Sequence, residues 1–174
     1  GKLLGDSTET ALVTYAIEKQ YTKENADQRY PLVEKLPFDS ERMRMSTLHS
    51  DGGKYLLLVK GAPAKMVGIL AHEHNNQKEG WLQLNRTWAA DGLRVLMFGY
   101  KILDQKPAKM EAALEKDLHF LGMTAMIDPP REEVIGAIDQ CKTAGIKTVM
   151  ITGDQPLTAK AIAERLHNID EGSA

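Results

Sequence analysis

Two short polar segments in the C-terminal third of the chain carry residues that could hold a phosphate or a metal ion. Residues 152–154 are Thr-Gly-Asp, and they follow an apolar run and precede a predicted helix. Residues 128–131 are Asp-Pro-Pro-Arg and end a neighbouring apolar run in the same way. Ligands bind at the carboxyl ends of strands in open α/β sheets, beside helix N-termini that favour anions. Taken alone, Thr-Gly-Asp is more often a helix cap, and Asp-Pro-Pro-Arg is a cap about as often as a site.

Three side chains in the first part of the chain have the right chemistry for a nucleotide. Lys60 stands at a predicted strand end and is followed by Gly61, so it can contact a phosphate or simply be solvated. Phe38 precedes a charged turn, where it can stack on a flat base or pack in the core. Arg94 lies in an apolar strand, so burial would require a partner, either a phosphate or a carboxylate.

Several other kinds of site are not indicated. The sequence contains neither a P-loop nor a dinucleotide-binding glycine motif. Residues 72–74, His-Glu-His, are expected to form a solvated polar loop without further ligands, so no metal site is predicted. Cys141 falls on the apolar face of a predicted helix and is interpreted as a packing residue.

Composition restricts the class of protein. The chain has 174 residues, 43% of them hydrophobic and 26% charged, with a net charge of -2. This balance argues against a nucleic-acid partner, which normally requires a basic excess. A single cysteine excludes an intrachain disulfide, and no apolar run approaches the roughly 20 residues that span a bilayer. No signal peptide is recognised, so we expect a soluble chain in the cytosol.

Hydrophobic periodicity and turn residues predict the elements of the first part. The pattern indicates an antiparallel sheet with helices packed on it. Glycine at position 92 is expected to end the third helix in a left-handed cap. The elements expected in chain order are a helix over 6–20, a loop over 21–29, strands over 32–36, 43–48 and 54–60, helices over 63–70 and from 78, a strand over 93–101 and a helix over 107–117.

The pattern changes after about residue 120. It predicts, in order, strand 121–127, helix 131–144, strand 146–152 and helix 156–166. Alternating strands and helices imply a parallel sheet with right-handed crossovers. The predicted fold class is therefore α/β (α+β), with two domains: residues 1–120 form an antiparallel sheet flanked by helices, and residues 121–174 form a partial parallel βαβα segment.

Six segments, in the same order, resemble motifs of the P-type ATPases, the ion pumps that pass through an aspartyl-phosphate. The set is most similar to the type II cation pumps, which include calcium, sodium/potassium and bacterial cation-transporting members. It covers essentially the whole chain. The segments are GDSTETAL at 5–12, PFDSERMRMS at 37–46, KGAP at 60–63, GLRVL at 92–96, DPPR at 128–131 and TGD at 152–154 with TAKAIA at 158–163.

The resemblance implies roles for individual residues. Glu9 would hydrogen-bond the adenine of ATP and Phe38 would stack on it, while Lys60 with Gly61 lines the pocket and Arg94 reaches the phosphates. When the two domains close, the γ-phosphate and Mg²⁺ would meet a second set of residues. That set is Asp128, Thr152, Gly153 and Asp154, in supporting catalytic roles.

Two substitutions and one absence depart from the family pattern. Met43 replaces a lysine that contacts phosphates, and Arg44 points to the other strand face and cannot simply replace it. Ala64 replaces the usual glutamate after K-G-A-P, which we expect to be a structural loss. The motif D-K-T-G-T, which carries the phosphorylated aspartate, is absent. We therefore expect a fragment of a pump that binds nucleotide but does not hydrolyse it.

The resemblance also implies partners and a location. ATP or ADP and the remaining phosphorylation, actuator and transmembrane domains of the same pump are the expected partners, at the cytoplasmic face of a cell membrane. The fragment itself is not expected to enter the membrane. Two alternatives remain: a soluble phosphohydrolase of the haloacid-dehalogenase type, which needs a nucleophile loop not found here, and a non-enzymatic nucleotide-sensing module. The sequence does not identify the transported ion, and calcium is one candidate.

Overall fold

The computed structural model describes residues 7–127, 132–151 and 156–166, and these residues form a mixed helix and strand fold. This confirms the predicted fold class. None of the helices among these residues is long and apolar enough to cross a membrane. The elements are α1 Ser7–Glu18, α2 Lys23–Arg29, β1 Leu32–Asp39, β2 Arg44–Asp51, β3 Lys54–Gly61, α3 Pro63–Met66, η1 Val67–Ile69, η2 His72–His74, α4 Lys78–Ala90, β4 Arg94–Leu103, η3 Ala112–Leu114, β5 His119–Met126, α5 Glu132–Thr143 and α6 Pro156–Arg165.

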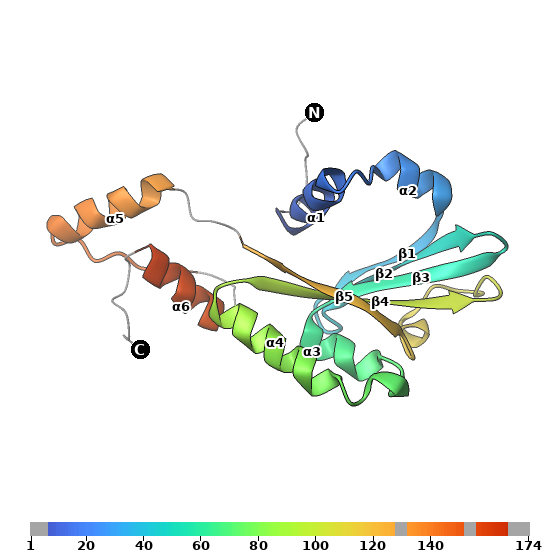
Figure 1. Cartoon of the computed structure of the whole chain (residues 1–174). Helices are drawn as coiled ribbons and strands as arrows, with labels where there is room; N and C mark the ends of the chain where they lie inside the picture. The colour runs from blue at the N-terminus through green and yellow to red at the C-terminus, as the bar shows by residue number, and fades with distance from the viewer. Residues whose placement is uncertain (1–6, 128–131, 152–155, 167–174) are drawn as a thin grey trace. The chain divides into compact units, whose positions relative to one another are not determined.

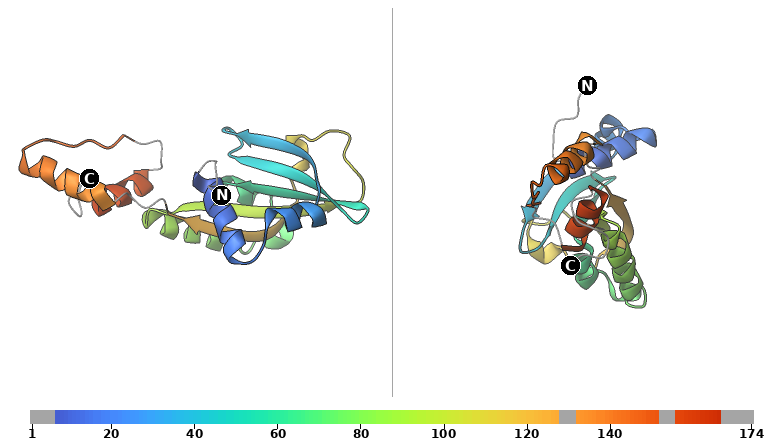
Figure 2. Two further views of the ribbon diagram at one scale, coloured as in Figure 1. Left: turned by 90° about the horizontal axis from the view of Figure 1, so that it is seen from above. Right: turned by 90° about the vertical axis from the view of Figure 1, so that its left-hand side faces the viewer.

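A five-stranded sheet with the order β1-β2-β3-β4-β5 organises the first of two compact units, residues 1–83 and 95–124. The pairs β1–β2, β2–β3 and β3–β4 are antiparallel. Helices α1 and α2 lie on one side of this sheet, and α3 and the start of α4 lie on the other (Figures 1 and 2). The sheet therefore has two helix-covered faces of different character.

The face toward α3 carries the hydrophobic core. Leu48, Leu57 and Met97 are fully buried there, and burying one such side chain contributes about 1.5–3 kcal/mol. The segments after β3 and before β5 contribute further buried residues to this core, and Trp81 of α4 packs against it. The remaining buried members of this cluster are Val59, Met66, Val67, Leu70, Met110 and Leu118.

Local turn chemistry sets the register of the central hairpin. Gly52 and Gly53 join β2 to β3 with φ of 55° and 91°, values that residues other than glycine rarely adopt. The ladder then runs without interruption from Asp51 opposite Lys54 to Arg44 opposite Gly61. Gly92, with φ 77°, follows α4 as expected.

Two predictions for the first unit were wrong in their local structure. Residues 23–29 form helix α2, because Thr22 caps it by accepting a hydrogen bond from the Asn25 N–H at 3.3 Å. Residues 107–117 form only the short η3 instead of a full helix. Met110 and Glu115 of this segment are both buried, so tertiary contacts override its helical propensity.

The strand predicted at 121–127 forms, but it belongs to a different sheet from the one expected. It is β5, which neighbours β4 at the edge of the antiparallel sheet. Leu118, the residue directly before β5, makes backbone hydrogen bonds to the segment before η2, at Ile69 and Ala71. The antiparallel sheet therefore takes the strand that was assigned to a parallel one.

The second compact unit consists of residues 84–94 and 125–174. Helices α5 and α6 form as predicted, and Gly145 follows α5 with φ 71°. The strand predicted over 146–152 is not formed in its described part, residues 146–151. Val149 and Ile151 are 75% and 95% exposed. A parallel strand is stable only when it pairs with a neighbouring strand and has both of its faces covered. The described residues of this unit supply no neighbouring strand.

Candidate functional site

The second face of the sheet, toward α1, brings two of the predicted site residues together. Lys60, next to last in β3, forms an ion pair with Glu9, in the first turn of α1. The Lys60 ammonium group donates to a carboxylate oxygen of Glu9. Both charges are partly solvent-accessible, so a ligand can approach either of them.

The strands on either side of Lys60 give its surroundings an apolar character. Met45 of β2 and Phe98 of β4 lie directly opposite Lys60, and opposite residues share a face of the sheet. Both are half-buried, in contrast to the fully buried residues of the other face. A cation flanked by a thioether and an aromatic ring suits a ligand with one flat apolar part and one anionic part.

Phe38 lies near the end of β1 with 62% of its surface exposed, so packing does not account for it. The turn that follows is fixed by Asp39, whose side chain accepts hydrogen bonds from the Glu41 and Arg42 N–H groups at 3.1 and 2.8 Å. Met43 in this turn is exposed and has φ 50°. An exposed phenylalanine beside a rigid turn is available for stacking on a ligand.

Arg44 is committed to a different partner, which agrees with its expected position on the other face. Arg42 Nη1 lies 2.6 Å from Glu115 Oε1, and Arg44 Nε lies 2.7 Å from Glu115 Oε2. Ser46 donates to the same carboxylate at 2.9 Å. The Glu115 side chain is 0% exposed. The two guanidinium groups thus neutralise a buried carboxylate, and sequence reasoning missed this cluster.

Gly61 has a structural requirement of its own. A Cβ at this position would lie 2.6 Å from the Met43 carbonyl oxygen and would overlap the Cβ of Arg44. Ala62 N–H donates to the same carbonyl at 3.0 Å. The close approach of two backbone segments therefore explains this glycine without a ligand.

None of the remaining predicted site residues belongs to the described part of the first unit. Arg94 begins β4 with an exposed side chain and belongs to the second compact unit. The supporting catalytic residues, Asp128, Thr152, Gly153 and Asp154, lie outside the described residues.

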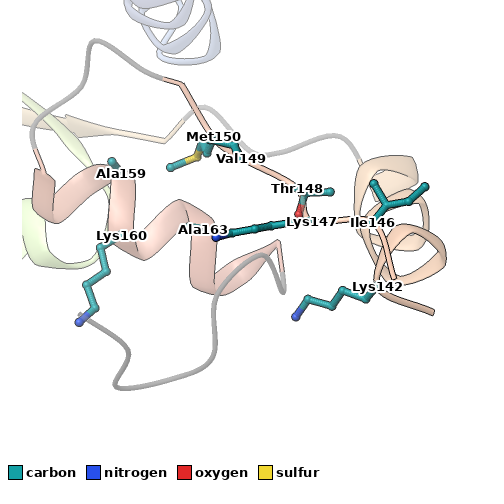
Figure 3. A pocket seen from close by; sticks show the side chains of 9 residues that line it. All are labelled: Lys142, Ile146, Lys147, Thr148, Val149, Met150, Ala159, Lys160 and Ala163. Carbon is teal, nitrogen blue, oxygen red and sulfur yellow. The ribbon is translucent and has the colours of Figure 1, made fainter. Parts of the chain in front are cut away.

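The second unit contains a cavity of about 570 Å³ between the end of α5, the irregular segment 146–150 and α6 (Figure 3). Its lining combines apolar side chains with lysines from each of these three elements. Since the segment does not form its predicted strand, we assign no ligand to this cavity. The lining residues are Lys142, Ile146, Lys147, Thr148, Val149, Met150, Ala159, Lys160 and Ala163.

Sequence reasoning also missed a histidine cluster. One ligand atom each from Glu73, His74 and His119 lies within 4.8 Å of the other two. The His-Glu part of the signal was visible, but His119 is 46 positions away from Glu73. No local sequence pattern could therefore have linked His119 to the other two residues.

Comparison with known proteins agrees with the family that the sequence motifs resemble. The chain is similar to the calcium-transporting ATPase 1 of Lactococcus lactis, with 38% identity over 99% of this chain and 21% of that protein. It is also 38% identical to the calcium-transporting ATPase of Bacillus subtilis, over 93% of this chain and 19% of that protein. A sodium/potassium exporting P-type ATPase of Schizosaccharomyces pombe is 35% identical over 93% of this chain and 16% of its own length.

The chain spans about a fifth of the length of these two calcium-transporting relatives. The family model described as "P-type ATPase, cytoplasmic domain N" matches residues 1–133. That match covers well over half of the chain. The chain therefore belongs to the P-type ATPase family, and its matched part is the cytoplasmic N domain.

Proposed function

We propose that this chain is the ATP-binding part of a cation-transporting P-type ATPase. Residues 1–120, together with the rest of β5 in the same sheet, would form the nucleotide-binding domain, and the part of the chain after β5 would belong to the phosphorylation domain. The single observation that supports this most is the pairing of Glu9 with Lys60 on the face of the sheet toward α1. They come from two separate family-like segments.

The surroundings of this pair fit a nucleotide. Phe38 is exposed and would stack on the adenine, and the Glu9 carboxylate would accept a hydrogen bond from the adenine amino group. Lys60 would place its ammonium group beside the phosphates, and the family resemblance gives Arg94 a phosphate contact as well. Because Met43 supplies no charge, the base should contribute more to affinity than the phosphates do.

The phosphoryl-transfer step would use residues beyond the nucleotide pocket. Asp128 and residues 152–154 would position the γ-phosphate, and Mg²⁺ would neutralise the charge that develops on it. In the whole protein this step would form an aspartyl-phosphate and drive cation movement, at the cytoplasmic face of a membrane. The relatives from Lactococcus lactis and Bacillus subtilis are named calcium-transporting ATPases, which favours calcium as the cation.

An NMR titration of the ¹⁵N-labelled chain with ATP tests the nucleotide pocket. We expect the amides of Glu9, Phe38 and Lys60 to shift, with a dissociation constant of about 0.1–1 mM, or roughly -4 to -5.5 kcal/mol. Shifts confined to residues 121–174 would overturn the assignment.

A matched pair of variants tests the stacking residue in the same assay. Phe38→Ala should weaken ATP binding by about 1–3 kcal/mol, the range for base–aromatic stacking. Leu32→Ala is the control, because Leu32 is an exposed apolar residue at the opposite end of the same strand. Equal ATP affinity of the two variants would show that Phe38 does not contact the base.

A further inference from the structure

The loop before α4 and the start of β5 together form a cluster of metal-ligating side chains. Glu73 Oε1 lies 3.3 Å from His74 Nε2 and 2.7 Å from His119 Nδ1. One ligand atom from each residue lies within 4.8 Å of the other two. Two imidazoles and one carboxylate form the ligand set of open tetrahedral zinc sites, in which water occupies the fourth position.

Two of the ligand separations, those of Glu73 from each histidine, are close to what a zinc ion requires. Zinc binds imidazole nitrogen and carboxylate oxygen at about 2.0–2.2 Å, so two ligands of a tetrahedral site lie about 3.3 Å apart. The contact between Glu73 and His74 already has this length. The shorter contact between Glu73 and His119 is a hydrogen bond, which an ion would replace and widen by a few tenths of an ångström.

The backbone holds the two ligand-bearing segments together. Leu118 N–H donates to the Ile69 carbonyl at 3.0 Å, and Ala71 N–H donates to the Leu118 carbonyl at 2.9 Å. These bonds bring His119, the next residue, beside the 3-10 helix η2, which begins directly after Ala71. The approach of the ligands is therefore set by the fold and does not depend on the ion.

Aromatic contacts restrict the two imidazole rings. The His74 ring lies 5.8 Å from the Trp81 ring, which stacks on Phe120 at 4.0 Å. The His119 ring lies 5.3 Å from the Tyr100 ring. Restricted rings lose less conformational entropy when they bind an ion. His74 is mostly buried, whereas Glu73 and His119 are exposed enough for an ion to enter from solvent.

One existing interaction opposes metal binding. Phe120 N–H donates to His74 Nε2 at 3.2 Å, and an ion at this nitrogen must displace that hydrogen bond. The affinity should therefore be lower than that of a closed structural zinc site with four protein ligands. Hard cations that prefer oxygen ligands, such as Ca²⁺ and Mg²⁺, gain little from two imidazoles.

We propose that Glu73, His74 and His119 form a binding site for Zn²⁺ or a similar borderline transition-metal ion on the nucleotide-binding domain. The site would have three protein ligands and one water. It is independent of the proposed nucleotide pocket, since it shares no residue with it.

Calorimetry of the full 174-residue chain with Zn²⁺ alone tests the proposal. We expect one bound ion, at least tenfold weaker binding in Glu73→Gln and His119→Ala, and no comparable response to Mg²⁺ or Ca²⁺. His72→Ala is the matched control, because His72 is an exposed histidine in the same 3-10 helix but outside the cluster. Zn²⁺ affinity that is unchanged in both cluster variants, or lowered equally in His72→Ala, would overturn the site.

The visible absorption of bound Co²⁺ gives a second readout that does not depend on activity. Bands of tetrahedral cobalt without a thiolate charge-transfer band are expected, and they should be lost in Glu73→Gln. Glu73 is exposed, so this variant is expected to retain the fold. A thiolate band would assign the ion to Cys141 and overturn the proposal.

Discussion

The ammonium group of Lys60 forms an ion pair with the Glu9 carboxylate and so joins the end of β3 to helix α1. Helix α1 buries none of its residues, so polar contacts of this kind have a large share in positioning it. A ligand that binds either charge changes the contact between helix and sheet. Nucleotide binding and the position of α1 should therefore be coupled.

Glu9 should determine the preference for adenine over guanine. Its carboxylate only accepts hydrogen bonds, so it suits the adenine amino group and repels the guanine O6 atom. AMP should bind within a few-fold of ATP, and GTP should bind clearly more weakly than ATP. In Glu9→Gln the side-chain amide can also donate, so the difference between ATP and GTP should narrow.

Calorimetry with ATP, AMP and GTP checks this prediction. Glu18→Gln is the control, because Glu18 is an exposed glutamate at the other end of the same helix. It should preserve the wild-type preference. Equal affinities of ATP and GTP in the wild-type chain would contradict the role given to Glu9.

The ion pair between Lys54 and Asp104 should give a measurable pKa shift without much stability. Lys54 Nζ lies 2.8 Å from Asp104 Oδ1, and both side chains are exposed. The hydrogen bond from Lys54, followed by its charge, lowers the pKa of Asp104. Because the folded pKa lies below the unfolded one, the small stabilisation is present above the unfolded pKa. It is lost as the pH falls through the folded pKa.

A carboxyl titration followed by NMR measures this shift. Lys54→Met should return the pKa of Asp104 toward its ordinary value, and high salt should reduce the shift in the wild-type chain. Lys35→Met removes an exposed lysine from another strand and should leave the pKa unchanged. A pKa of Asp104 that does not respond to Lys54→Met would contradict the pairing.

Local signals in the sequence were sufficient for much of the first unit. Helix α1, the hairpin of β2 and β3, and the glycine after α4 follow from capping, turn chemistry and periodicity. The convergence of Glu9 and Lys60 was also expected, because both segments resemble parts of one family site, but their direct ion pair was not. Each of these features depends on residues close in sequence or on a known order of motifs.

Other features depend on partners distant in sequence, and the sequence does not show them. Glu115 pairs with arginines 71 and 73 positions away, and this holds its segment out of the predicted helix. The strand expected at 146–152 has the right residues, but its described part lacks a neighbouring strand. Periodicity reports which face of an element is apolar, not whether another element is present to cover it.

Gly61→Ala should destabilise the chain although alanine adds only one methyl group. The new Cβ would meet the Met43 carbonyl oxygen and Arg44, both of which belong to the neighbouring strand and its turn. Overpacking of this kind costs about 1–3 kcal/mol. Gly80→Ala is the control, because nothing lies within 4 Å of a Cβ there and alanine favours a helix by up to about 1 kcal/mol. Thermal unfolding should separate the two variants in opposite directions.

The buried carboxylate of Glu115 should be among the most sensitive positions of the first unit. Arg42 and Arg44 both donate hydrogen bonds to it, and the Ser46 hydroxyl is a third donor. Glu115→Ala leaves Arg44 without its counter-charge in a largely buried place, and it leaves Arg42 only the more distant carboxylate of Asp39, 3.8 Å away. Removal of one partner from a buried ion pair costs about 3–5 kcal/mol.

Chemical denaturation measures this loss as a lower free energy of unfolding. Glu111→Ala is the control, because Glu111 is exposed and its side chain makes no capping hydrogen bond to η3, the 3-10 helix just before Glu115. This variant should change the free energy of unfolding by less than about 0.5 kcal/mol. The triple variant Arg42→Met, Arg44→Met and Glu115→Met should recover part of the loss, since apolar residues can replace a buried ionic cluster. Equal stability of Glu115→Ala and Glu111→Ala would show that the arginines find other partners, and that this carboxylate does not hold the turn after β1 in place.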